Sequence, residues 1–329
     1  MKKIIMLLTV CFAASAAGGW NPGPCSKLNS LAVSSIRHYE QNYRSLESKA
    51  GSFKIFICAD GLQLPLPYDS IDNAYIFSLK NTQFKKLINS PIKRTRWLLK
   101  KEIEAYFVKT WLEGDKLVVG LFLKKGRIGN REDLWTETDR MAYVYRYCEE
   151  DGKWRKWVLD ETKRNFDIPQ NNPLNLMAVS CIKNFRTDED YNCKDDYEDY
   201  AELTGKKEVA KMTYVCEDAL QEPFPYDSID NASHFSCYNK ITGELKKLLR
   251  KYSIDKDAMN DFGLPTIFVK MNFVEKDLVI TIFENEVYMD KWYWWPKRKS
   301  VLCVYNNDDC NFIYRYSEKS GKWELVESD

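Results

Sequence analysis

An eight-residue segment, Pro-Tyr-Asp-Ser-Ile-Asp-Asn-Ala, occurs twice in this chain, at residues 67–74 and again at 225–232. Around this octapeptide single residues match at a constant spacing of 158, as Cys58 does with Cys216. Matches also occur at a spacing of 146 near the start of each half and of 169 near its end. Because the matches keep the same order along the chain, the sequence predicts a tandem duplication, two copies of one folding unit.

The start of the chain has the three parts of an export signal. Two lysines precede an apolar run at 4–14, and small residues follow at 15–17, where signal peptidase would cut. The run is too short for a membrane span, which needs about 20 residues. We therefore expect a signal peptide at 1–17, a first domain at 20–165, a second domain at 166–329, and a protein that is exported, either periplasmic or secreted.

Charge is distributed unequally between the two halves, although the whole chain carries only +1. Residues 21–165 carry 26 Lys and Arg against 18 Asp and Glu, whereas residues 166–329 carry 21 against 30. Opposite charges attract across an interface, so we expect the halves to dock on each other. A nucleic-acid-binding duplication would carry a basic face on both copies, and the acidic second copy argues against nucleic acid as a partner.

Cysteines permit disulfides in an exported chain. One of the ten cysteines, Cys11, lies in the signal segment, and the remaining nine are an odd number, so at least one thiol is left over or pairs between chains. Cys303 and Cys310 are near enough in sequence to bridge across a tight turn. Cys58 and Cys216 occupy matching positions and fit small buried residues. No Cys/His pattern suggests zinc, and we expect no cofactor.

Hydrophobic spacing predicts the same order of elements in both halves. Apolar residues recur three and four positions apart near the start of each half, which is the spacing of one helix face. The expected helices lie at 28–43 and 84–88 in the first half and at 174–185 and 245–249 in the second. The expected strands lie at 53–58, 106–111, 116–123, 143–147 and 154–159, and at 212–216, 267–273, 278–283, 312–316 and 323–326. The fold class is therefore α+β, with two tandem homologous domains.

This order of elements resembles the nuclear-transport-factor-2-like superfamily of cone-shaped α+β domains, in particular its small exported bacterial members of unknown function. The resemblance is carried by the opening helix at 28–43, by a helix start at Phe77-Ser78-Leu79, and by the closing Gly-Lys-Trp turns at 152–154 and 321–323. It implies that N-terminal helices pack on a curved antiparallel sheet with a concave pocket. Since the superfamily includes enzymes, binding modules and immunity-type partners, it does not imply what the pocket holds.

The octapeptide has both a structural and a functional interpretation. Structurally, the Asp69-Ser70 pair can close a turn, and Asp72 or Asn73 can cap a helix that follows. Functionally, its polar side chains would line equivalent ligand or partner sites in the two copies. The candidate residues are Tyr68, Asp69, Asp72 and Asn73 in the first copy and Tyr226, Asp227, Asp230 and Asn231 in the second.

Two further segments have candidate side chains. Trp292 and Trp294 alternate with Tyr293 and Trp295, so one side of this segment can pack while the other offers a stacking surface to a sugar or a protein. An acidic stretch spaces its oxygens as a calcium loop does, but Cys193 stands where the loop needs Gly and the last position is Asp instead of Glu. The calcium candidates are Asp188, Asp190, Asn192, Asp196 and Asp199.

Histidines do not support a duplicated catalytic site, because His38 and His234 match Asn184 and Ile76 in the other copy. We therefore expect a non-catalytic binding or interaction protein, whose partner is a protein, peptide or glycan in the envelope or outside the cell. Two alternatives stay open: a hydrolase of envelope polymers that uses the octapeptide carboxylates, and a calcium-stabilised structural protein. Peripheral contact with a membrane also stays open.

Overall fold

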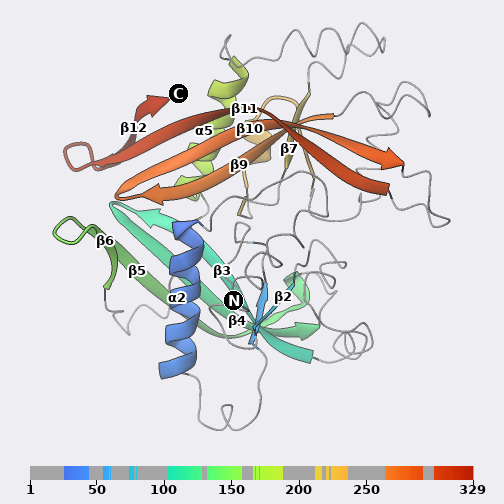
Figure 1. Ribbon diagram of the computed structural model, residues 1–329. Coiled ribbons are helices and arrows are strands. Elements are labelled where there is room, and N and C mark those ends of the chain that lie inside the picture. Colours follow the sequence, from blue (N-terminus) through green and yellow to red (C-terminus); the bar gives the residue numbers. More distant parts are fainter. Residues whose placement is uncertain are drawn as a thin grey trace, which may run out of the picture.

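The computed structural model describes residues 26–43, 55–58, 60, 74–77, 79, 102–127, 132–157, 166, 168–169, 171–187, 212–216, 220–221, 224–235, 264–291 and 300–328. Within these ranges, two α-helices and twelve strands form two curved six-stranded sheets (Figure 1). One sheet comes from residues 55–157, which with the helix before them are called the first half. The other sheet comes from residues 213–328, which with the preceding helix are called the second half.

The first half contains helix α2 (Lys27–Asn42) and strands β1 (Ile55–Cys58), β2 (Ala74–Phe77), β3 (Glu102–Glu113), β4 (Lys116–Arg127), β5 (Thr136–Cys148) and β6 (Lys153–Trp157), with a short 3₁₀ helix η3 (Glu132–Leu134). Its strand order is β2-β1-β3-β4-β5-β6. Strand β1 runs parallel to both β2 and β3, and every later pairing is antiparallel.

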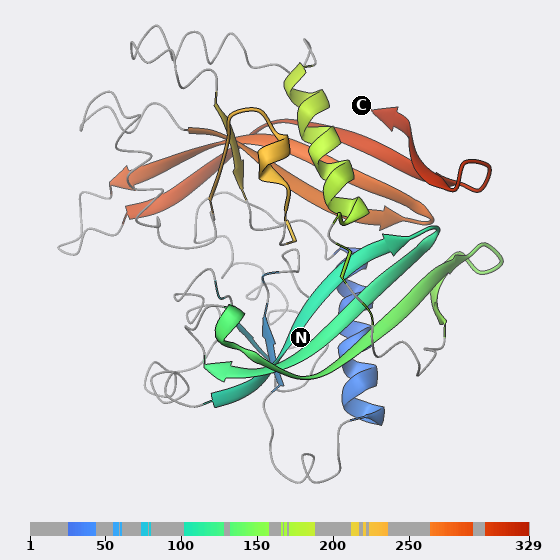
Figure 2. The same cartoon turned by 180° about the vertical axis from the view of Figure 1, so that it is seen from behind.

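The second half contains helix α5 (Pro173–Thr187) and strands β7 (Thr213–Cys216), β8 (Ala232–Phe235), β9 (Leu264–Val274), β10 (Asp277–Lys291), β11 (Ser300–Ser317) and β12 (Lys322–Ser328), with a 3₁₀ helix η7 (Tyr226–Ser228). Its strand order, β8-β7-β9-β10-β11-β12, repeats that of the first half element by element. Strand β7, which corresponds to β1, runs parallel to both β8 and β9. Helix α2 lies in front of its sheet in Figure 1, and α5 lies in front of its own sheet in the view from behind (Figure 2).

The α+β class and the expected hairpins are confirmed, but two details of the prediction are wrong. The sheets are mixed instead of wholly antiparallel, and a strand follows each octapeptide where a helix was expected. Phe77, expected at a helix start, is the last residue of β2 and pairs with Cys58 of the parallel strand β1. The short apolar run of β2 fits a strand as well as a helix turn, and pairing with β1 decides between them. The helices expected at 84–88 and 245–249 lie outside the described residues.

Both helices are capped at their N-termini by residues at matching positions. The Ser26 side chain accepts the Asn29 N–H at 3.2 Å, and the Asn172 side chain accepts the Leu174 N–H at 3.1 Å. Ser and Asn are favoured here because a helix leaves its first N–H groups without partners. A buried stripe along α2 then seats it on the sheet. Its members are Leu28, Leu31, Ala32, Ile36 and Tyr39.

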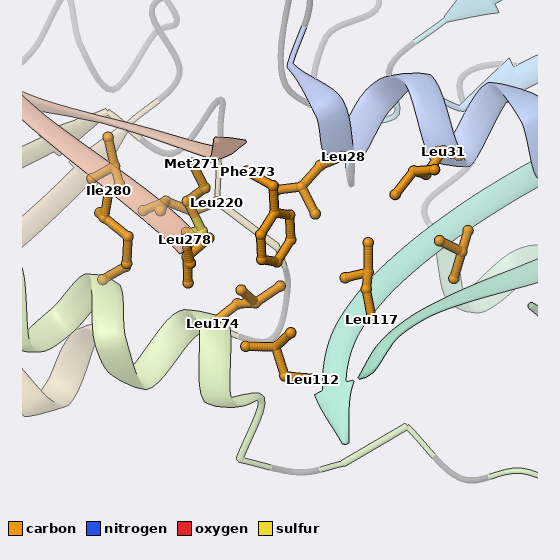
Figure 3. Close-up of a cluster of buried hydrophobic side chains, with 14 of the residues drawn as sticks. Leu28, Leu31, Leu112, Leu117, Leu174, Leu220, Met271, Phe273, Leu278 and Ile280 are labelled. Carbon is orange, nitrogen blue, oxygen red and sulfur yellow. The ribbon is translucent and has the colours of Figure 1, made fainter. Parts of the chain in front are cut away.

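Apolar side chains from both halves form one continuous buried cluster (Figure 3). It includes Leu28, Leu31, Leu112 and Leu117 of the first half and Leu174, Leu220, Met271, Phe273, Leu278 and Ile280 of the second. The Trp154 ring lies on Phe273 across the junction, with ring centroids 4.5 Å apart. Each side chain of this size that leaves water contributes about 1.5–3 kcal/mol. The halves are therefore in contact, as the sequence predicts, through a junction that is largely apolar.

Two tryptophans at the tips of the last hairpins make reciprocal hydrogen bonds between the halves. Trp154 Nε1 donates to the carbonyl of Glu275 at 2.8 Å, and Trp323 Nε1 donates to the carbonyl of Gly114 at 2.9 Å. Gly114 and Glu275 both have a positive φ, at 60° and 53°, in the turns of the β3–β4 and β9–β10 hairpins. Each half thus places its closing tryptophan on the turn of the other.

Side chains of the second half also complete the open edge of β3. Strand β1 pairs with β3 only at 105–107, so Thr110 has no strand partner on that side. Gln221 Oε1 accepts the Thr110 N–H at 2.8 Å, and Asn172 Nδ2 donates to the Thr110 carbonyl at 2.8 Å. Gln221 Nε2 also donates to the Thr110 hydroxyl. These bonds satisfy a buried backbone as a neighbouring strand would.

None of the five cysteines whose side chains are described forms a disulfide: Cys58, Cys148, Cys181, Cys216 and Cys310. Cys58 and Cys216 are buried, as expected of small core residues. The tight turn that would let Cys303 and Cys310 bridge is absent, because both residues lie on the one strand β11. Seven residues of strand span about 23 Å, far beyond disulfide reach. Among the described helices, none is long and apolar enough to cross a membrane.

Candidate functional site

The second copy of the octapeptide forms a turn that leads into strand β8. The Ser228 N–H donates to the Pro225 carbonyl at 3.0 Å, and the Ile229 N–H donates to the Tyr226 carbonyl at 2.9 Å. Asn231 then takes a left-handed φ of 53°, a conformation that Asn tolerates better than most residues. The predicted turn is confirmed, whereas the predicted helix cap is wrong, because a strand begins at the next residue.

The polar side chains of this turn differ in their exposure to solvent. Asp227, Asp230 and Asn231 are exposed to solvent. Tyr226 packs against the core instead, with its ring stacked on His234 at 3.8 Å between centroids and an interplanar angle of 9°. Tyr226 therefore differs in its surroundings from the three exposed candidates, and whether the four contact a ligand or partner stays a prediction.

The remaining sequence candidates lie outside the described residues. These are Tyr68, Asp69, Asp72 and Asn73 of the first octapeptide, Trp292 and Trp294, and the calcium candidates Asp188, Asp190, Asn192, Asp196 and Asp199. In the part of the chain that is described, no three His, Cys, Asp or Glu side chains meet closely enough to hold a metal ion.

A polar cluster that the sequence reading missed lies between the C-terminal end of α2 and the sheet of the first half. Tyr39 Oη donates to the Asp139 carboxylate, and Tyr106 Oη donates to Glu40 Oε1 at 2.6 Å. The Tyr39 and Tyr106 rings meet edge to face, 5.7 Å apart. We call the whole group the tyrosine–carboxylate cluster; it comprises His38, Tyr39, Glu40, Tyr43, Glu104, Tyr106, Asp139 and Tyr143.

His38 and Tyr43 connect the cluster to its exposed rim. His38 Nδ1 lies 3.3 Å from Tyr143 Oη, and the His38 and Tyr143 rings meet edge to face. Tyr43 stacks on Tyr39 at 5.9 Å between centroids and keeps 39% of its surface exposed. Glu104, also exposed, accepts a hydrogen bond from the Thr138 hydroxyl at 3.0 Å. The cluster therefore runs from buried phenols to an aromatic and acidic surface.

Burial determines which groups in the cluster carry charge. It raises the pKa of Tyr39 well above its usual value, and the hydrogen bond to Asp139 and the negative charges of Glu104 and Glu40 raise it further. Burial likewise raises the pKa of Tyr143. The pKa of His38 is lowered from 6.5, first by burial and then by the charge of Lys156. At neutral pH the phenols are therefore protonated hydrogen-bond donors, and the imidazole is uncharged.

Matching positions of the second half are apolar. Tyr39 matches Phe185, Tyr106 matches Ile267, and Tyr143 matches Phe312. All three second-half residues are buried, so the same place in that half is ordinary hydrophobic core. One contact between helix and sheet recurs at matching positions in the two halves, which shows that the cluster and this apolar core occupy equivalent places. Ser35 Oγ lies 2.7 Å from Tyr145 Oη, and Cys181 Sγ, at the matching position, lies 3.4 Å from Tyr314 Oη.

A signal for this cluster is present in the sequence, in the positions at which one copy is polar and the other apolar. The identical octapeptide directs attention to residues that the two copies share, and positions at which the copies differ are then missed. Comparisons with protein-family models, curated proteins and solved structures give no match to this chain. The site is therefore argued from its own geometry.

Proposed function

We propose that this protein is an exported, non-catalytic binding protein made of two copies of one α+β domain, and that the first copy holds the ligand. The signal-like pattern at 1–17 supports export. The repeated strand order and the reciprocal tryptophan contacts support the duplication. The partner class is a peptide, protein or glycan outside the cytoplasm.

The observation that carries the proposal is the tyrosine–carboxylate cluster at a place where the second copy has apolar core. Phe185, Ile267 and Phe312 show that packing α5 on its sheet needs no hydroxyl there. Placing phenols at the same positions brings polar groups out of water, and a hydrogen bond returns only about 0.5–1.5 kcal/mol net. The cluster therefore adds little to the stability of the fold. Recognition of a ligand would explain why the first copy has it.

The electrostatics favour binding over catalysis. A tyrosine acts as nucleophile or base only when it can lose its proton, and the raised pKa of Tyr39 and of Tyr143 keeps both protonated. Their hydroxyls serve as donors that orient carboxylates such as Asp139. Oriented acceptors beside exposed rings are the elements of a recognition surface.

Isothermal titration calorimetry tests this proposal with three probes: a cationic tripeptide, an anionic tripeptide and a neutral trisaccharide. The decisive variant is the triple change Tyr39→Phe, Tyr106→Ile and Tyr143→Phe, which copies the second half. At least one probe should bind the wild type, bind the triple variant at least ten times more weakly, and emerge chemically unchanged by mass spectrometry.

Tyr314→Phe is the matched control, because it removes a buried phenol from the second half and should leave binding unchanged. Circular dichroism checks that the triple variant keeps its fold. The proposal fails if no probe binds, if the triple variant binds as well as the wild type, or if the bound probe is converted to product.

A further inference from the structure

We infer that the tyrosine–carboxylate cluster receives a cationic group, the ammonium or guanidinium of a lysine or arginine side chain on a peptide partner. This inference rests on the proposed binding function and specifies its ligand.

Within the described ranges, two carboxylates of the cluster accept hydrogen bonds from neutral donors only, although Lys125 is the cross-strand register partner of Glu104. Asp139 accepts from Tyr39 and from the backbone N–H of Arg140, and Glu104 accepts from the Thr138 hydroxyl. Neither forms a salt bridge within the described part of the chain. These neutral donors fix the carboxylates in place and leave their negative charge uncompensated. A carboxylate held in this way gains most from a ligand that brings a positive charge.

The nearest described cations form no salt bridge with Asp139 or Glu104. The Arg140 guanidinium pairs with Glu137 at 2.5 Å and donates to the Phe166 carbonyl at 3.2 Å. Its carbon lies 5.8 Å from the centroid of Phe122, whose ring belongs to a cluster separate from the shared core. Lys156 lies over the Tyr143 ring, 5.6 Å from its centroid. Among the described residues, no cation therefore pairs with the acidic side of the cluster, where a cation from outside the chain can bind.

Aromatic rings at the rim favour an organic cation. Tyr43 stacks on Tyr39 and is partly exposed, so a ring face is accessible beside the carboxylates. The face of an aromatic ring attracts ammonium and guanidinium groups, with about 0.5–2 kcal/mol per contact. His38, which touches both Tyr43 and Tyr143, is uncharged at neutral pH because its pKa is lowered, and it does not repel such a group.

The second half keeps one acid at a matching position, since Asp139 matches Asp308, but it lacks the phenols of the cluster. Glu40 matches Arg186, which reverses the charge, and Tyr106 matches Ile267, which removes the donor that holds the carboxylate. A cationic side chain would meet an apolar core and a like charge there. We therefore expect one cation site per chain, in the first half.

Calorimetry with two tripeptides at low salt tests the inference on the full exported chain. Acetyl-Gly-Arg-Gly amide should bind, and the citrulline counterpart, which keeps the shape and loses the charge, should bind at least ten times more weakly. Asp139→Asn keeps the acceptor for Tyr39 and so preserves packing, yet it should weaken arginine binding about tenfold. Asp277→Asn, which removes the partner of Arg315 in the second half, should leave binding unchanged.

The outcomes separate this inference from the proposed function. Equal binding of the arginine and citrulline peptides overturns the cation assignment. The cation assignment is also overturned if the neutral trisaccharide binds in a tyrosine-dependent way and neither peptide binds. In that case the proposed function still stands. An Asp139→Asn variant that binds arginine as tightly as the wild type, with an unchanged melting temperature, also overturns the assignment. If no probe binds at all, the proposed function fails and the inference fails with it.

Discussion

Gln221→Met tests the junction between the two halves where it is most polar. Gln221 is 8% exposed and Thr110 is 2% exposed, so water does not replace the bonds that the glutamine side chain provides. Methionine fills a similar volume but leaves the Thr110 N–H, now bonded at 2.8 Å, without an acceptor. A buried donor left without a partner costs about 1–3 kcal/mol, and loss of the bond to the hydroxyl adds about 1 kcal/mol. We expect a total destabilisation of about 2–4 kcal/mol.

Urea denaturation followed by tryptophan fluorescence measures this loss. Because apolar residues of both halves share one cluster, we expect a single transition whose midpoint moves as a whole. Thr110→Val is the control, since it removes only the hydroxyl, and the double variant should lose less stability than the two single losses combined. A loss below about 0.5 kcal/mol, or two separate transitions of which one moves, would refute this account of the junction.

Three further changes have defined outcomes. Gly126→Ala would bring a Cβ closer to the Trp135 ring than real Cβ contacts allow, so the melting temperature should fall by the equivalent of about 1–3 kcal/mol, and an unchanged value contradicts this. Trp154→Phe removes the hydrogen bond to the Glu275 carbonyl and should cost about 1 kcal/mol in urea denaturation. The folded chain lowers the pKa of His38 from 6.5, so its contribution to stability is present above that pH and is lost as the pH falls below it. His38→Asn should therefore lessen the drop in unfolding free energy between pH 7.5 and 5.5, and an identical drop argues against it.

Hydrophobic spacing predicts part of the fold. The hairpin strands and the opening helices follow from local periodicity, and their matching positions in the two halves gave each prediction a second test. Hydrophobic spacing does not predict the element after the octapeptide, because the short run Ala74–Phe77 fits either a strand or the start of a helix. Strand β1 decides between them by pairing in parallel, and such non-local pairing is not written in the local sequence.

The candidate site was harder to predict because its members come from distant segments. Tyr39, Tyr106 and Asp139 are on a helix and two strands, and only the fold brings them together. The octapeptide was conspicuous because its copies are identical, yet Tyr226 faces the core and the carboxylates of the turn face solvent. Identity between copies marked what the shared fold requires. A difference between copies marks the place where we propose function.

Hydrogen exchange of the full chain, with and without its tightest-binding probe, tests the central claim most directly. Binding in the first copy should slow exchange in peptides that cover 36–43, 102–108 and 136–144. Exchange should be unchanged in the matching peptides at 182–187, 264–269 and 307–313. Equal protection of both sets, or protection confined to 224–235, would contradict the assignment of the ligand to the tyrosine–carboxylate cluster.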